Sequence, residues 1–100
     1  MLDAFNGLIT EHEVACQLCE EAAELFQAAN KLRRLLDGKN PTPKRREEIM
    51  EDLLEEAADV SGCLLLLGIG LEEIKAIRSR KLRRWYNRLQ NNKKVGNANG

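Results

Sequence analysis

Two short acidic stretches contain the residues whose types and spacing could do chemistry. Glu21 and Glu24 stand three residues apart in the sequence EEAAE, and Glu56 and Asp59 have the same spacing in EEAAD. Residues three apart share one face of an α-helix, so each pair would present two carboxylates together. If two such helices pack with these faces inward, four carboxylates converge. Oxygen ligands of this kind favour hard divalent ions, so the pattern predicts a site for Mg²⁺, with Mn²⁺ as a substitute.

The apolar residues around these acids follow a helical period, and two of the acids interrupt it. The stripes, with alternating steps of four and three, are Val14, Leu18, Glu21, Leu25, Ala28, Leu32 and Leu35, followed by Ile49, Leu53, Glu56, Val60, Cys63 and Leu67. Glu21 and Glu56 therefore occupy positions that the period assigns to a core. An uncompensated charge there costs several kcal/mol, so we expect a cation between the stripes.

The first acidic pair lies in a long predicted helix. Thr10 is a suitable N-cap, and Glu13 three residues later completes a capping box. Few helix breakers follow until Asp37 and Gly38, where the glycine can supply a left-handed C-cap. The sequence predicts a turn over residues 37–43.

Two further helices are predicted after this turn. Thr42 and Pro43 form an N-cap and first-turn pair, so the second helix is expected to begin there and to run to about Leu67. Glycines at 68 and 70 break it, and a third helix is expected from Leu71 to about residue 90. The Asn, Lys and Gly residues that follow predict a disordered C-terminal tail over residues 91–100.

The predicted fold class is all-α, because alternating apolar patterns are absent. We expect one domain over residues 1–90, a helical bundle of three main helices per chain. Four consecutive leucines at 64–67 are apolar on every side of their helix, and one neighbouring helix cannot cover them. Self-association to a homodimer or homotetramer is therefore expected to complete the bundle.

Charge and cysteine content limit the classes of function. The 100 residues have a net charge of zero, but residues 47–59 hold seven acids and no base, whereas every charged residue after Glu73 is basic. Without overall positive charge, nucleic acid is an unlikely partner. No apolar stretch approaches the roughly 20 residues of a membrane helix, and no secretory signal is evident. Three cysteines argue against a disulfide framework, so a cytoplasmic protein is expected.

The two acidic motifs, EEAAELFQ at residues 20–27 and LEEAADV at 54–60, resemble those of the all-α nucleoside triphosphate pyrophosphohydrolases of the MazG type. The resemblance spans roughly residues 11–88. It implies hydrolysis of a nucleoside triphosphate between the α and β phosphates, giving a monophosphate and pyrophosphate. It also implies that Mg²⁺ is held by Glu21, Glu24, Glu56 and Asp59, with Glu20 as a further ligand or as the residue that orients water.

The same resemblance implies that basic residues grip the phosphates. Lys81 and Arg84 stand one turn apart in the third helix and would contact the β and γ phosphates. Ser79 departs from the asparagine expected near them. Lys31, on the face of Glu24, is a weaker candidate.

Other readings of these residues remain open. The acidic stretches are also compatible with a solvated helix face, and Cys16, Cys19, Cys63 and His12 are compatible with a zinc site, although buried cysteine is commoner. Trp85 could stack on a base, but its spacing with Leu82 and Leu89 favours a core position. The alternative function is a small non-enzymatic binding module that uses the basic third helix, and a ligand-free structural bundle is a third possibility.

Overall fold

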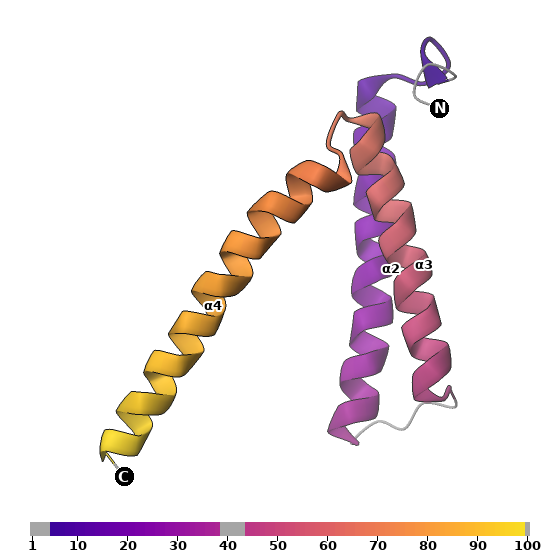
Figure 1. Ribbon diagram of the computed structural model, residues 1–100. Helices are drawn as coiled ribbons and strands as arrows, with labels where there is room; N and C mark the ends of the chain where they lie inside the picture. Colours follow the sequence, from indigo (N-terminus) through magenta and orange to yellow (C-terminus); the bar gives the residue numbers. More distant parts are fainter. Residues whose placement is uncertain (1–4, 39–43, 100) are drawn as a thin grey trace. The chain divides into compact units, whose positions relative to one another are not determined.

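The computed structural model describes residues 5–38 and 44–99, with side chains up to residue 94. This part of the chain is helical and contains no strand, which confirms the all-α class. The three helices are α2 (Glu11–Asp37), α3 (Arg46–Leu66) and α4 (Leu71–Asn99), as Figure 1 shows. They belong to two compact units, Met1–Ile69 and Gly70–Gly100, which are described separately below.

Helix α2 begins and ends where the sequence predicts. The Thr10 hydroxyl oxygen accepts a hydrogen bond from the Glu13 backbone N–H at 3.1 Å, which is the expected N-cap contact. The return bond differs from a standard capping box, because the Glu13 carboxylate accepts from the Thr10 hydroxyl, also at 3.1 Å. At the other end Gly38 has φ 74°, and its N–H donates to the Arg34 carbonyl at 3.0 Å. This left-handed cap suits glycine, which has no Cβ to clash.

Helix α3 begins later than predicted. Thr42 and Pro43, the expected start, lie outside the described residues, and the helix starts at Arg46 with Arg45 as its extended N-cap. The Glu48 carboxylate accepts from the Arg45 backbone N–H at 3.4 Å and from its side chain at 3.2 Å. This contact gives the helix its own start signal. The helix ends at Leu66, and the predicted break follows at Gly68, which has φ 89°.

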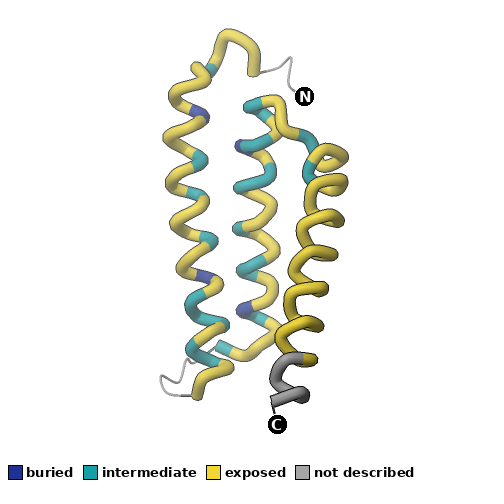
Figure 2. The backbone as a smooth tube through the Cα atoms, turned by 90° about the vertical axis from the view of Figure 1, so that its left-hand side faces the viewer, coloured by how far each residue is buried: buried dark blue, intermediate teal, exposed yellow. Residues whose placement is uncertain are grey.

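Helices α2 and α3 lie side by side as an antiparallel pair (Figures 1 and 2). Every member of the two predicted stripes is buried or half-buried in this pair. Among the described residues, those classed as buried are Val14, Ala28, Ile49 and Cys63, and these positions, dark blue in Figure 2, mark two levels of the helix pair. Glu21 lies seven residues from each buried residue of α2, and Glu56 likewise in α3. The apolar levels therefore align the helices above and below the two acids.

Helix α4 is longer and more exposed than predicted. The helix continues through Asn99, past its predicted end at about residue 90, so residues 91–99 are helical where a disordered tail was predicted. Extending an existing helix adds one hydrogen bond per residue fixed, so weak helix formers can follow a strong start. Among its described side chains, through residue 94, only Ile74 is partly buried. Trp85, expected in a core, is 53% exposed within the chain.

Among the described residues, no helix has both the length and the apolar character needed to span a bilayer.

Candidate metal centre

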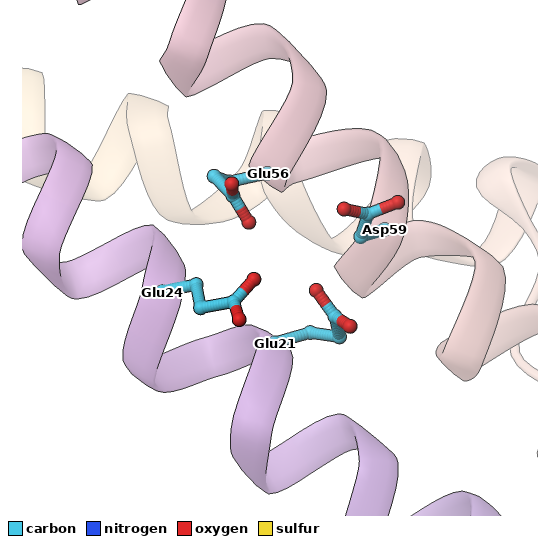
Figure 3. A group of neighbouring side chains, drawn as sticks. All are labelled: Glu21, Glu24, Glu56 and Asp59. Carbon is cyan, nitrogen blue, oxygen red and sulfur yellow. The ribbon is translucent and has the colours of Figure 1, made fainter.

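Four carboxylates from α2 and α3 meet between the helices. One oxygen from each of Glu21, Glu24, Glu56 and Asp59 lies within 4.8 Å of the others. Figure 3 shows the side chains of α2 pointing toward those of α3, with Glu21 opposite Asp59 and Glu24 opposite Glu56. The structure thus brings together the four residues that the two motifs predict, and their donor set is made of oxygen alone.

Two of these carboxylates carry an oxygen that is enclosed by protein. Oε2 of Glu21 and Oε2 of Glu56 are shielded from solvent and have no hydrogen-bond partner. Glu24 and Asp59 are exposed and form the open side of the group. A shielded carboxylate oxygen without a partner is unfavourable, and the four carboxylates of the cluster also repel one another. A divalent cation among them would remove both costs, so the residues present fit Mg²⁺ or Mn²⁺.

The electrostatics of Glu21 reflect this crowding. Gln17 donates a hydrogen bond of 2.7 Å to Glu21 Oε1, which by itself lowers the pKa of that carboxyl. Desolvation and the charges of Glu24 and Asp59 outweigh it, so the pKa of Glu21 is raised above its ordinary value. A metal ion would act in the opposite direction, because it favours the charged form.

The predicted site residues on α2 differ in their positions. Glu20 is exposed and is not one of the four clustered carboxylates, so its role as ligand or water-orienting residue stays a prediction. Lys31 is half-buried and lines a hollow of about 390 Å³ together with Glu24 and Glu56. Lys31 therefore contributes a positive charge to a hollow that borders the carboxylate cluster.

Lys44 lines the same hollow, and the sequence analysis missed it. Its Nζ contacts Oδ2 of Asp52 at 2.6 Å. This hydrogen bond and the opposite charge raise the pKa of Lys44 and lower that of Asp52, where Lys31 adds a smaller attraction. The sequence did not indicate this contact, because residue 44 was expected inside a helix that starts at Thr42. In the structure Lys44 precedes α3, which starts at Arg46.

Lys81 and Arg84, the predicted phosphate contacts, belong to α4 in the second unit. Both are exposed, and Lys81 borders a shallow hollow with Ile74 and Leu82 on the same helix. Their action on a substrate stays a prediction.

The cysteines behave differently from the acids. Cys16 and Cys19 are exposed, Cys63 is buried, and all three are free thiols. His12 lies 3.9 Å from the Cys16 sulfur, but the described residues form no group of these side chains that could share one ion. Burial, together with the charges of Glu21 and Asp59, raises the pKa of the Cys63 thiol. Cys63 therefore acts as a small core residue beside the carboxylates.

Comparisons with protein-family models, with curated proteins and with solved structures find no match. The resemblance to the MazG type consequently depends on the two acidic motifs of the sequence.

Proposed function

We propose that this protein is a Mg²⁺-dependent pyrophosphohydrolase of nucleoside or deoxynucleoside triphosphates, which cleaves between the α and β phosphates to give a monophosphate and pyrophosphate. Its role would be to clear surplus or non-standard nucleotides from the cytoplasmic pool. The observation that carries the proposal is the enclosed, unpartnered oxygen on each of Glu21 and Glu56, in a cluster of four carboxylates. A solvated acidic face does not require such oxygens.

Each residue has a role that its position supports. Glu21 and Glu56 would hold the ion from within, while Glu24 and Asp59 would hold it at the open side, where substrate enters. Mg²⁺ supplies neutralisation of phosphate charge and a lower pKa for water. Glu20, the exposed residue before Glu21 in the chain, would be a further ligand or would orient the attacking water.

The basic residues would bind the substrate, and α4 would mediate self-association. Lys31 would contact the phosphates from the hollow that it shares with Glu24. Lys81 and Arg84 are the further phosphate contacts that the resemblance implies. The exposed apolar side chains of α4 support a homodimer or homotetramer, because water contact with them is unfavourable. A MazG-type bundle would then be completed between subunits.

One observation favours a second function. The described bases of α4 are all exposed, as a nucleic-acid-binding or protein-binding helix requires. The net charge of zero weakens that alternative, because phosphate-backbone binding depends on positive charge.

The test is a screen of the common ribo- and deoxynucleoside triphosphates with Mg²⁺, in which pyrophosphate and orthophosphate are measured separately. We expect pyrophosphate and a monophosphate. Glu24→Gln should lower turnover by about 100-fold or more, since even residues that support a metal ligand are typically worth 10–100-fold.

The matched control is Glu51→Gln, which removes one exposed carboxylate from α3 outside the cluster and should leave turnover unchanged. Orthophosphate as the sole phosphorus product would contradict cleavage after the α phosphate. Salt-sensitive binding of DNA or RNA that survives Glu21→Gln and Glu56→Gln, with no turnover, would favour the binding module.

A further inference from the structure

Two hollows border the carboxylate cluster on the α2–α3 unit, one beside each pair of facing carboxylates. The first has a volume of about 360 Å³ and adjoins Glu21 and Asp59; its other lining residues are Phe5, Ala58, Gly62, Cys63, Leu65 and Leu66. The second has a volume of about 390 Å³ and adjoins Glu24 and Glu56; its other lining residues are Gln27, Ala28, Lys31, Lys44 and Asp52. Both volumes lie within the range of about 300–1,000 Å³ that small-molecule sites occupy.

The first hollow is suited to an uncharged, flat group. Apart from the two cluster carboxylates at its edge, its lining is apolar. Phe5 offers a partly exposed ring on which another ring can stack, and the buried Cys63 adds a small thiol. A phosphate group would be desolvated here without any cation from the lining residues.

The second hollow is suited to anionic oxygens. Lys31 and Lys44 both line it, and Asp52 holds the Lys44 ammonium at 2.6 Å. Glu24 and Glu56, on its other side, belong to the metal cluster, so their charges would be taken up by the ion. Asp52 offsets one of the two ammonium charges, so one net positive charge, from Lys31 and the Asp52-paired Lys44, faces this hollow and attracts phosphate oxygens.

This asymmetry carries an inference that rests on the proposed function and deepens it. We propose that the nucleotide lies along the α2–α3 groove with its base in the hollow of Phe5, Gly62 and Cys63 and its terminal phosphates toward Lys31 and Lys44. The carboxylate cluster, which would hold the ion, lies between the two hollows. In this pose it is beside the bond between the α and β phosphates. The base-side hollow therefore sets substrate preference, and Lys44 is a phosphate-binding residue.

Gly62 allows a test that does not damage the helix. A Cβ added at this position meets no atom within 4 Å, and leucine is a far better helix former than glycine. Gly62→Leu should fill the base-side hollow while α3 stays folded. The matched control is Ala57→Leu, which adds a leucine at an exposed position of the same helix outside both hollows.

Binding is measured by calorimetry with Mg²⁺ and two probes: non-hydrolysable α,β-imido deoxynucleoside triphosphates, and inorganic tripolyphosphate, which has no base. Gly62→Leu should weaken binding of the imido nucleotides about tenfold or more and leave tripolyphosphate binding unchanged. A double variant, Lys31→Gln with Lys44→Gln, should weaken both probes by similar factors. Ala57→Leu should match the wild type.

Three results would overturn the inference. Wild-type nucleotide affinity in Gly62→Leu would place the base elsewhere, and so would equal weakening of both probes by that variant. Wild-type tripolyphosphate affinity in the lysine double variant would show that Lys31 and Lys44 do not bind the phosphates. In each of these cases Glu24→Gln still abolishes Mg²⁺-dependent binding, so the proposed function survives. If the wild type binds neither probe with Mg²⁺, the proposed function fails together with the inference.

Discussion

The α2–α3 pair and α4 treat similar side chains in opposite ways. In the pair, apolar residues at helical spacing are buried or half-buried, and acidic residues stand among them. In α4 the described apolar side chains are exposed apart from the partly buried Ile74, and the charged residues after its first turn are basic. The exposed large side chains are Leu71, Ile77, Leu82, Trp85, Tyr86 and Leu89. Helices α2 and α3 cover each other's apolar faces, whereas the unit that contains α4 has no second helix among its described residues.

This difference separates two tasks. The carboxylate cluster needs only the contacts that α2 and α3 make with each other, because the apolar levels seven residues away on either side hold both helices. Helix α4 presents Leu82, Trp85 and Leu89 at steps of three and four on one face, yet each is 52% exposed or more. We therefore propose that the pair binds the ion and that α4 mediates self-association.

The largest effect that tests this division is metal-dependent stability. Binding to the folded state alone at 100 times the dissociation constant adds about 2.7 kcal/mol, which raises the melting temperature of a domain this size by roughly 10 °C. We expect such a rise on adding Mn²⁺ or Mg²⁺ to chelator-treated protein, followed by calorimetry. Glu56→Gln should abolish it, whereas Glu55→Gln, an exposed neighbour, should retain it. An equal rise in melting temperature in both variants would show that the ion does not bind at the carboxylate cluster.

A smaller effect is expected on self-association. Trp85→Glu places a charge on the exposed apolar face of α4, and loss of a central interface aromatic commonly costs 2 kcal/mol or more, so association should weaken about 30-fold. Sedimentation equilibrium measures the change, and circular dichroism checks that the helices persist. Asn87→Glu adds the same charge to the opposite face of the helix and should change little. A wild type that stays monomeric at high concentration would remove the role assigned to α4.

The sequence predicted the two stripes of residues that α2 and α3 bury or half-bury against each other. Its stripes depend on the helical period, which is local information, and the conflict between that period and the charges of Glu21 and Glu56 identified the site. The caps at Thr10 and Gly38 were likewise local and were confirmed. Local patterns suffice where two helices of one chain bury each other.

Other features depend on contacts that a local pattern does not contain. The Lys44–Asp52 contact joins a residue before α3 to one in its second turn, and it was missed because the start of α3 was placed too early. Trp85 has core spacing but no covering helix in the described part of its unit, so period alone misjudged its burial. The two hollows arise from side-chain packing, which the spacing of motifs does not define.

The smallest expected effect concerns the pH dependence of the metal-free protein, and it isolates the charge that the pair encloses. The pKa of Glu21 is raised in the folded state, so its protonated form favours folding: the contribution is fully present below the unfolded value of 4.5 and is lost as pH rises through the folded pKa. Asp52 acts in the opposite sense, because its lowered pKa gives stability that is lost as pH falls. Urea unfolding in chelator at several pH values should therefore compare Glu21→Gln with the wild type directly. Glu21→Gln should be more stable than the wild type above the folded pKa of Glu21, and this difference should vanish below pH 4.5. The control Glu20→Gln, at an exposed position, should show no such pH-dependent difference. A wild type more stable than Glu21→Gln at neutral pH would mean that other groups of the protein compensate the enclosed carboxylate.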